Sequence, residues 1–347
     1  MLEPRLFANH MGNRQMVDES NAWAVILAAG EGTRLQALTT LPSGIAIPKQ
    51  FCSLYEGPSL LEEALRRGES VADRSHICAV VAEQHRCWWE GALGSLPDSN
   101  VIVQPQNRGT ANGILLPLMR ILRRDPSARI VLLPSDHHVL HEAVLAASLR
   151  EALELLDSRS EETLLLGIQP GEVDPDLGYI LPGEIDGRGA LTVARFIEKP
   201  SHAVAGELIR AGGLWNAFIV VTTAGALLEL FRQRIPEVVE AMRAALHRDD
   251  AQGFGVAAVT ELYPRLPTLD FSRDIVAGQE SKLRVLPVRP CGWSDLGTPK
   301  RVAEVLHRVR AKAGCPGRPA GPGHVSLAAQ HERLQIVGYC NRAAAAQ

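Results

Sequence analysis

The sequence predicts an α/β protein built around a doubly wound, mostly parallel mixed sheet. Two observations support this prediction. Short apolar, β-branched runs recur along the chain, and amphipathic stretches of helical length alternate with them. The alternation begins with AVILAA (residues 24–29), which runs directly into a glycine turn. A strand followed by a turn and a helix is typical of the first unit of a parallel sheet.

The individual elements follow from the same patterns. Strands are predicted at residues 24–29, 76–81, 101–104, 129–133 and 163–167, with helices between them at residues 59–69, 83–93, 112–123 and 142–156. Three later strands, at residues 190–198, 215–221 and 283–288, are expected to extend the sheet. No internal repeat or long linker interrupts residues 21–312, so we expect one folded domain there, after a loose extension (1–20) and before a short tail (313–347).

Composition and charge narrow the classes of partner. The 347 residues are 46% hydrophobic and 22% charged, enough for one large core, and the net charge is −3. A net charge this close to zero gives no general attraction to nucleic acid or an anionic membrane, so individual positively charged side chains must bind any phosphate. The six cysteines show no CxxC spacing, no apolar run reaches membrane-spanning length, and residues 1–20 lack a hydrophobic signal core. We therefore expect a cytoplasmic protein.

The turn after the first strand predicts a phosphate-binding loop. Gly30 and Gly32 allow the backbone to approach an anion closely, and Arg34 and Lys49 supply positive charge, which suits a triphosphate. The dinucleotide fingerprint would need a third glycine where Leu35 stands, and the P-loop would need Gly-Lys-Ser/Thr where the chain has Gly-Thr-Arg. A lone GxGTR is a common glycine turn, but the PKQF at residues 48–51 favours a phosphate role.

With these two motifs the chain resembles the sugar-1-phosphate nucleotidyltransferases, and among them the mannose-1-phosphate guanylyltransferases. The likeness continues in the family's order through QPQNRGTANGI (104–114), LLPSDHHV (132–139), DLGYI (176–180), FIEKPS (196–201), LWNAFIV (214–220), LDFSRDIV (269–276) and GWSDLG (292–297). It covers about residues 23–300 and implies a Rossmann-like, GT-A-like catalytic domain that uses Mg²⁺. Some family members carry a left-handed β-helix after this domain, for which residues 313–347 are too few.

Two aspartates are the expected magnesium ligands. Asp136 follows a predicted strand, at the sheet edge where ligands collect in α/β proteins, although an N-cap of a helix starting near His137 is the alternative. The resemblance favours the metal role and implies that Asp295, otherwise a turn aspartate, lies across the pocket from Asp136. A zinc site at His137, His138 and His141 is disfavoured, because catalytic zinc needs three convergent ligands and no cysteine lies nearby.

The resemblance also implies a nucleotide-binding region. Its expected members are Ala28, Ala29, Gly30, Gly32 and Thr33 in the first loop, with Gln104, Arg108 and Thr110 around the base. The chain departs from the usual family pattern at Ala29, Gly109 and Asn112-Gly113. These departures leave the preference for a particular purine open.

A sugar-phosphate region is implied in the same way. Its expected members are Gly178, Glu198, Lys199 and Asn216. Glu198 would accept hydrogen bonds from sugar hydroxyls and Lys199 would bind the sugar phosphate. An isolated EKP is also a common solvated turn, so the motif gains its meaning from its place between DLGYI and LWNAF.

The resemblance implies transfer of GMP from GTP to mannose 1-phosphate or a close sugar 1-phosphate, which yields a GDP-sugar and pyrophosphate. Arg34 would stabilise charge on the transferring phosphoryl group, and Lys49 would hold the nucleotide phosphates. The alternatives are another nucleoside triphosphate, another sugar or cyclitol 1-phosphate, a catalytically silent nucleotide-sugar sensor, and a hydride-transferring dinucleotide enzyme that Leu35 disfavours. A homodimer is left open.

Overall fold

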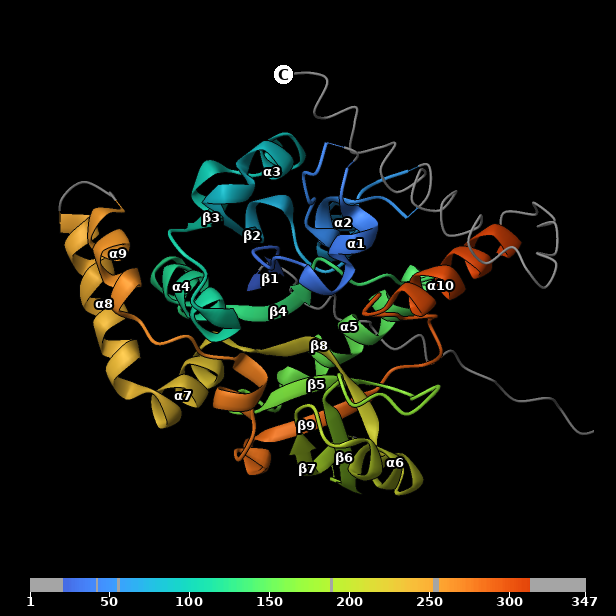
Figure 1. The fold of residues 1–347 in the computed structure, drawn as a ribbon. Coiled ribbons are helices and arrows are strands. Elements are labelled where there is room, and N and C mark those ends of the chain that lie inside the picture. Colours follow the sequence, from blue (N-terminus) through green and yellow to red (C-terminus); the bar gives the residue numbers. More distant parts are fainter. Residues whose placement is uncertain (1–20, 42, 55–56, 188–189, 252–255, 313–347) are drawn as a thin grey trace, which may run out of the picture.

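The computed structural model describes residues 21–41, 43–54, 57–187, 190–251 and 256–312. Across these residues the chain forms one mixed sheet with helices on both faces (Figure 1). The predicted extension (1–20) and tail (313–347) lie outside the described residues. None of the helices in the described part of the chain is long and apolar enough to cross a membrane.

The described sheet has nine strands. In spatial order they are β3 (Val101–Gln104), β2 (Ile77–Ala82), β1 (Ala22–Leu27), β4 (Arg129–Pro134), β8 (Leu214–Thr223), β5 (Thr163–Ile168), β9 (Leu283–Pro287), β7 (Leu191–Ile197) and β6 (Tyr179–Ile185). The eight strands predicted from the sequence are all present, displaced by at most two residues at either end. The expected α/β class with a mixed sheet is confirmed.

The first half of the sheet is parallel. The central strand β1 pairs in parallel with β2 on one side and β4 on the other, so that Val25 lies beside both Cys78 and Leu132. The chain first builds outward from β1 through β2 to β3, and then returns to place β4 on the opposite side of β1. The carboxyl ends of β1 and β4 therefore flank a reversal of strand order, where α/β sheets collect their ligands.

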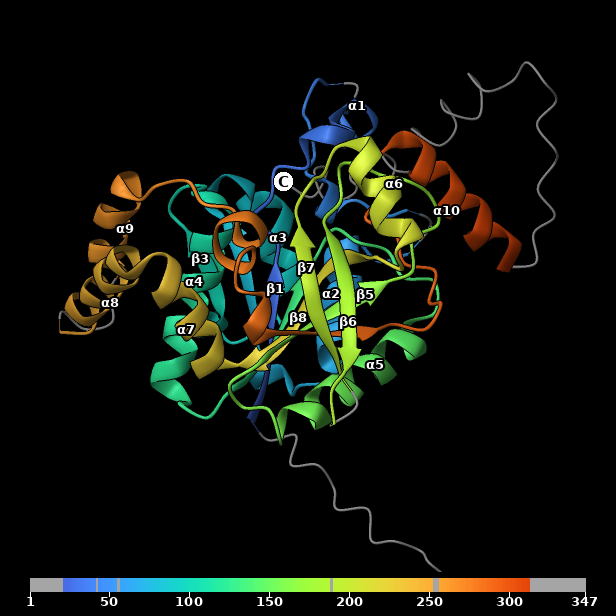
Figure 2. The same ribbon diagram turned by 90° about the horizontal axis from the view of Figure 1, so that it is seen from below.

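The second half of the sheet corrects the prediction of mostly parallel pairing. Strand β8 is antiparallel to both β4 and β5, β7 is antiparallel to β6 and β9, and only β5 and β9 run in parallel. An additional pairing of β6 with β8 closes β8, β5, β9, β7 and β6 into a small ring (Figure 2). Strand β6 was not predicted, because Pro182 and Gly183 interrupt its pattern where the register with β7 shifts.

Two hydrophobic cores lie on opposite faces of the sheet. Along β1, Ala24 and Ile26 belong to one core and Trp23 and Val25 to the other, as alternating strand side chains require. The first core is covered by α2 (Leu60–Glu69), α3 (Arg86–Leu93), α5 (Glu142–Leu156), α6 (His202–Arg210) and α10 (Pro299–Lys312). The second is covered by α4 (Gly109–Arg124), α7 (Ala224–Arg234), α8 (Pro236–Ala251) and α9 (Ala257–Leu262). The short α1 (Gln36–Thr39) follows the glycine turn.

Candidate active site

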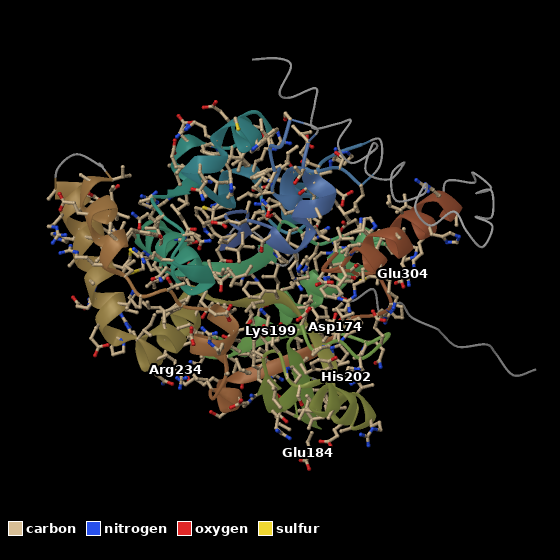
Figure 3. The ribbon with its side chains drawn as sticks, in the orientation of Figure 1. Asp174, Glu184, Lys199, His202, Arg234 and Glu304 are labelled. Atoms are coloured by element: carbon tan, nitrogen blue, oxygen red, sulfur yellow. The ribbon has the colours of Figure 1, made fainter. Side chains whose placement is uncertain are left out.

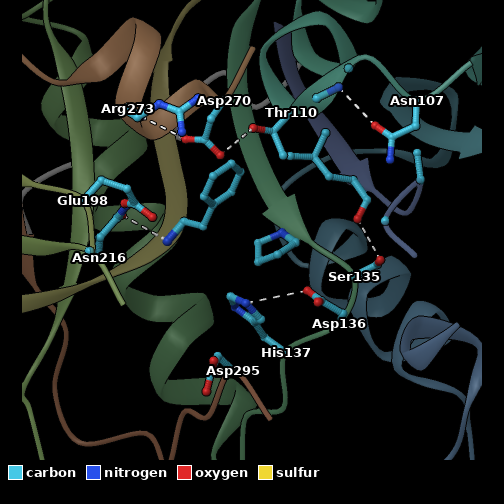
Figure 4. Close-up of a pocket in the computed structure, with 18 of the residues that line it drawn as sticks. Asn107, Thr110, Ser135, Asp136, His137, Glu198, Asn216, Asp270, Arg273 and Asp295 are labelled. Carbon is cyan, nitrogen blue, oxygen red and sulfur yellow. Dashed lines mark hydrogen bonds and ion pairs between the residues drawn. The ribbon is translucent and has the colours of Figure 1, made fainter. Parts of the chain in front are cut away.

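A cavity of about 500 Å³ opens at the carboxyl ends of β1 and β4 and extends to β7 and β8 (Figure 4). Most of the predicted site residues meet there. Those that line the cavity are Ala29, Gly30, Arg34, Gln104, Thr110, Asp136, Gly178, Glu198, Lys199, Asn216 and Asp295. The structure therefore brings together, in one place, side chains from segments that span residues 29–295.

The first loop is fixed by a side chain that the sequence analysis did not single out. Gln50, from the PKQF motif, is buried, and its side-chain amide donates to the carbonyl of Ala28 at 3.0 Å and to that of Gly30 at 2.6 Å. Ala28 itself is buried beneath the loop and donates its backbone N–H to Val80. The PKQF motif thus shapes the loop through its glutamine as well as supplying a lysine.

A smaller cavity of about 200 Å³ adjoins the first and shares Arg34 and Asp136 with it. Gly32, Thr33 and Lys49 also line it. Gly32 has a φ of 62°, and a Cβ there would lie 2.9 Å from the backbone nitrogen of Lys49, so only glycine fits this close approach. The side chain of Arg34 is 52% exposed and remains accessible from both cavities.

Lys49 joins the two predicted magnesium ligands. Its buried ammonium lies 3.0 Å from Oδ2 of Asp136 and donates to the main-chain carbonyl of Asp295 at 2.6 Å. A pair of backbone hydrogen bonds between His138 and Ser294, both 2.9 Å, links the same two segments. Two aspartates 159 positions apart in the sequence are therefore held at one cavity.

Both aspartates are ionised in this setting. Burial opposes ionisation of Asp136, but Lys49 and His137 outweigh it and hold the pKa of this carboxyl below its usual range. Burial likewise opposes ionisation of Asp295, and His137, Arg301 and Lys49 together keep its pKa low. Oδ2 of Asp295 is buried without a hydrogen-bond partner among the described residues. Two carboxylates, one of which has a buried oxygen that accepts no hydrogen bond from the described residues, form a donor set that suits a hard divalent cation.

The position of the next helix excludes one alternative for Asp136. Helix α5 begins at Glu142, so Asp136 is not the N-cap of a helix starting near His137. His137 lines the cavity, and burial lowers its pKa to about 4, which leaves the imidazole neutral near neutral pH. His138 is buried and does not line this cavity, and His141 is exposed. Among the described residues, no three His, Cys, Asp or Glu side chains converge on a common metal position.

Two of the three side chains expected around the base line the cavity. Gln104 is buried, lies 3.4 Å from the hydroxyl of Tyr263, and lines the cavity. Thr110 also lines it and accepts from the backbone N–H of Phe271 at 2.8 Å. Arg108 does not line the cavity, because its guanidinium donates to the carbonyls of Tyr263 and Pro264 instead.

The departure at Gly109 has a structural reason. Its φ is 81°, and a Cβ there would lie 2.1 Å from the carbonyl oxygen of Leu269. The segment at Leu269 packs directly on the start of α4, where Leu269 exchanges backbone hydrogen bonds with Arg108 and Ala111. Only glycine can occupy position 109 in this arrangement.

The residues expected to bind the sugar phosphate line the cavity at β6, β7 and β8. Glu198 follows the end of β7, and burial and the nearby Asp270 raise its pKa to about 7. Its Oε2 is buried without a hydrogen-bond partner among the described residues. Asn216, on β8, donates its backbone N–H to the carbonyl of Gly178 at 2.8 Å, and Lys199 lies at the exposed side of the cavity. The cavity thus offers an acceptor-rich carboxyl and a solvated cation at the same end.

Several cavity residues were not predicted. Asp270 and Arg273 lie next to Glu198 and Thr110 in Figure 4, in a single turn of π-helix and its N-cap (Asp270, then Phe271–Val276). The LDFSRDIV motif marked the segment, but no regular periodicity indicated which of its side chains face the cavity. Asp176 lies in the motif DLGYI and comes within 3.9 Å of Arg34.

Three non-glycine residues with left-handed backbone lie at the two cavities. Lys199, Phe218 and Leu296 have φ values of 49°, 55° and 49°. Residues with a Cβ adopt this conformation at a penalty and tend to do so at functional sites. Phe218 donates its N–H to the side chain of Asn216 at 3.1 Å, and Leu296 directly follows Asp295.

An α/β sheet with a glycine loop, several cations and two aspartates at one edge is typical of proteins that bind nucleotide phosphates. Comparison with known families makes the class specific. The chain belongs to the nucleotidyl transferase family, whose pattern matches residues 23–312. The resemblance found in the sequence motifs is therefore confirmed.

The relatives of the chain include proteins with an assigned reaction. It is 27% identical over 308 residues to the mannose-1-phosphate guanylyltransferase of Escherichia coli (strain K12), covering 86% of this chain and 63% of the relative. It is 28% identical over 330 residues to a putative mannose-1-phosphate guanylyltransferase of Vibrio cholerae, covering 90% and 67%. The chain thus spans about two thirds of the length of these two relatives.

A solved structure shares the fold. The protein described as mannose-1-phosphate geranyltransferase from Thermus thermophilus superposes with a TM-score of 0.68 at 27% identity. The match covers 80% of this chain and 76% of that one.

Proposed function

We propose that this chain transfers the GMP group of GTP to mannose 1-phosphate, or a close sugar 1-phosphate, and releases pyrophosphate. The observation that carries the proposal is the position of Lys49, which pairs with the carboxylate of Asp136 and donates to the main-chain carbonyl of Asp295, beside a loop suited to phosphate. The names of relatives that share 27–28% identity with most of the chain support the choice of guanylyl transfer and of mannose 1-phosphate.

The residues present fit a magnesium ion. Asp136 and Asp295 both line the cavity in ionised form, and one oxygen of Asp295 has no hydrogen-bond donor among the described residues. These two side chains would hold Mg²⁺, with the remaining positions left to water and phosphate oxygens. When bound, the ion neutralises charge on the phosphates and favours departure of pyrophosphate.

At the nucleotide end, the loop of Ala29, Gly30, Gly32 and Thr33 would bind the triphosphate through its backbone. Arg34 lines both cavities, so its guanidinium can stabilise negative charge on the α-phosphoryl group and on the leaving pyrophosphate. Lys49 already contacts two acceptors, and its remaining N–H is available to a phosphate oxygen. Its main role in this proposal is to hold the two aspartates in place.

At the sugar end, Glu198 would accept from sugar hydroxyls and Lys199 would bind the sugar phosphate. The buried Oε2 of Glu198 needs donors, and hydroxyl groups supply them. Gly178 and Asn216 complete this side of the cavity. A phosphate oxygen of the sugar 1-phosphate then attacks the α-phosphorus of GTP in line with the departing pyrophosphate, and no covalent enzyme intermediate is needed.

A substrate panel tests the proposal. The purified full chain is incubated with Mg²⁺, each of the five common nucleoside triphosphates and a set of hexose, heptose and cyclitol 1-phosphates, and pyrophosphate release is measured. We expect the largest kcat/KM for GTP with mannose 1-phosphate. A larger value for another pair would reassign the substrates within the family, and no release with any pair would favour the silent sensor.

Three finer points belong to the same proposal. We place the reaction in the cytoplasm, in keeping with free thiols at Cys52, Cys78, Cys87 and Cys291. A homodimer is the assembly that we would test first, by light scattering of the purified chain. The parallel half of the sheet, with helices on both faces, would correspond to the doubly wound unit.

A further inference from the structure

Arg301 lies outside every motif quoted above, on the helix α10 that follows GWSDLG. Its side chain is only 8% exposed. Nη1 donates to Oδ1 of Asp295 at 2.6 Å, Nη2 lies 2.5 Å from Oδ2 of Asp174, and Nε lies 3.4 Å from Oε1 of Glu172. A single buried guanidinium therefore contacts three carboxylates.

The two carboxylate oxygens of Asp295 have different partners, and Arg301 contacts only one of them. Oδ1 accepts from Arg301 and, at 3.1 Å, from the backbone N–H of Gly297. Oδ2 has no hydrogen-bond donor among the described residues, and Arg34 lies 3.5 Å from it. Two donors on one oxygen fix the rotation of the carboxylate, so the other oxygen is the one available at the cavity.

The contact between Arg301 and Asp174 connects α10 to the segment before β6, which contains the proposed sugar-binding residue Gly178. The backbone N–H and carbonyl of Asp174 both hydrogen-bond to the hydroxyl of Tyr179 at 3.0 Å, at the start of β6. Between these two residues lie Asp176, Leu177 and Gly178, all of which line the cavity. Figure 3 shows Asp174 between the strands of the sugar side and α10, where Glu304 marks the helix.

The planar guanidinium of Arg301 suits simultaneous contacts with Asp295 and Asp174. The guanidinium of Arg301 lies over the ring of Trp215, 5.1 Å from its centroid, and Trp215 in turn donates to the hydroxyl of Tyr179 at 3.1 Å. A planar group with five fixed donors can hold several carboxylates while stacking on an aromatic face, which an ammonium cannot do. A buried ion pair is weak evidence for a gain in stability. The contacts of Arg301 with three carboxylates therefore suggest a role in positioning these groups.

We propose that Arg301 is a positioning residue that turns one oxygen of Asp295 towards the catalytic metal and ties the segment 172–178 of the sugar side to the same carboxylate. This inference rests on the proposed function. It adds α10 to the machinery of the site, although no residue of this helix lines the main cavity.

Metal affinity, measured without turnover, tests the inference. Mn²⁺ binding to the full chain is followed by electron paramagnetic resonance in the presence of a GTP analogue with a methylene bridge between the α and β phosphorus atoms. The variants are R301M, R301K and the control K300M. Lys300 is the neighbour of Arg301 on α10, is exposed, and pairs with Glu172 at 2.8 Å without contacting Asp295. Thermal unfolding confirms that each variant is folded.

We expect R301M to bind Mn²⁺ about 10-fold to 100-fold more weakly than the wild type, as when other partners of metal ligands are removed. R301K should fall between R301M and the wild type, and K300M should match the wild type. In a D295N background, R301M should cause no further loss, because Arg301 acts through that carboxylate. The KM for the sugar 1-phosphate should also rise in R301M but not in K300M.

Wild-type affinity for Mn²⁺ in R301M, or an equal loss in the D295N background, would overturn the inference. If R301M does not fold, the same comparison with R301K decides. A wild-type chain that binds Mn²⁺ but transfers no nucleotide would contradict the proposed function, and the effect of Arg301 on Mn²⁺ affinity would still be measurable. A wild-type chain that binds no Mn²⁺ would sink both.

Discussion

Gly178 and Glu198 are in such close contact that a Cβ on residue 178 would lie 2.4 Å from Oε2 of Glu198. In G178A the carboxyl must therefore move away from its place in the cavity. We expect the KM for the sugar 1-phosphate to rise roughly 10-fold or more, because a displacement of about 1 Å can weaken catalysis strongly. Steady-state kinetics measure this, with G171A as the control, since nothing lies within 4 Å of a Cβ at Gly171. An unchanged KM in G178A would remove Glu198 from the sugar contacts.

Loss of either carboxylate proposed to bind the metal should lower turnover more than it weakens substrate binding. D136N and D295N keep the size of the side chain but remove its charge, so we expect kcat to fall by roughly 10²-fold or more, with a higher Mg²⁺ concentration needed for half activation. The measurement is pyrophosphate release over a Mg²⁺ titration. The exposed Asp98 gives the control D98N. Wild-type turnover in either variant would exclude that residue as a ligand.

Arg34 should matter chiefly in the transition state. Its half-exposed guanidinium lines both cavities, and its ion pairs with Asp176 and Asp295 are long, at 3.9 and 3.5 Å. R34A should lower kcat by roughly 10²-fold, as for the loss of other preorganised charge stabilisers. Single-turnover kinetics at saturating GTP check this. R150A, on the surface of α5, serves as the control, and an equal fall in both variants would contradict the assignment.

Gln50 should act on the nucleotide through the loop that it holds. Q50A removes two hydrogen bonds to the carbonyls of Ala28 and Gly30, which are worth about 1 kcal/mol each. We expect the KM for GTP to rise roughly 10-fold, whereas the KM for the sugar 1-phosphate stays constant. Q233A, an exposed change on α7, is the control. If both KM values moved together, the effect would be on the fold and not on the loop.

Glu198 should make stability depend on pH. Its pKa is raised to about 7 in the folded protein from the ordinary glutamate value of 4.5, so the folded state holds the proton over that interval. Its contribution to stability is fully present below pH 4.5 and is lost as the pH rises through about 7. Between about pH 5 and about pH 8, the free energy of unfolding in urea should therefore fall more in the wild type than in E198Q.

The control for this titration is E184Q, because Glu184 is exposed and lies away from the cavity (Figure 3). It should follow the wild type at every pH. Parallel curves for E198Q and the wild type would show that Glu198 titrates normally.

The sequence predicted the position of a residue well where the residue type favours one local backbone conformation. The glycine turn, Asp136 after a buried strand and Glu198 at the end of another all occupy the cavity, because the carboxyl ends of strands converge there. Strand β6 was missed because Pro182 and Gly183 do not look like a strand, although they fit at a shift in register. Helices α6 to α10 were not predicted, and they form much of the outer layers.

Side-chain direction was harder to predict than position. Arg108 and Gln104 stand four residues apart in one motif, yet only Gln104 lines the cavity, since Arg108 is drawn to carbonyls of a segment 155 residues away. Gln50 and Arg301 act on backbone or carboxyl groups of distant segments, and no local pattern marks such a partner. Long-range contacts of this kind require the tertiary structure.

The left-handed backbones of Lys199, Phe218 and Leu296 bear on how this protein could be engineered. Each costs about 1–2 kcal/mol of backbone strain. A glycine would recover this energy only at the exposed Lys199, because Leu296 is fully buried and Phe218 packs against Phe271. A directed-evolution experiment scored only on survival after heating would therefore favour a glycine at position 199. Because Lys199 is the proposed ligand of the sugar phosphate and follows Glu198, such an experiment would select more stable proteins with less activity unless turnover were selected in the same round.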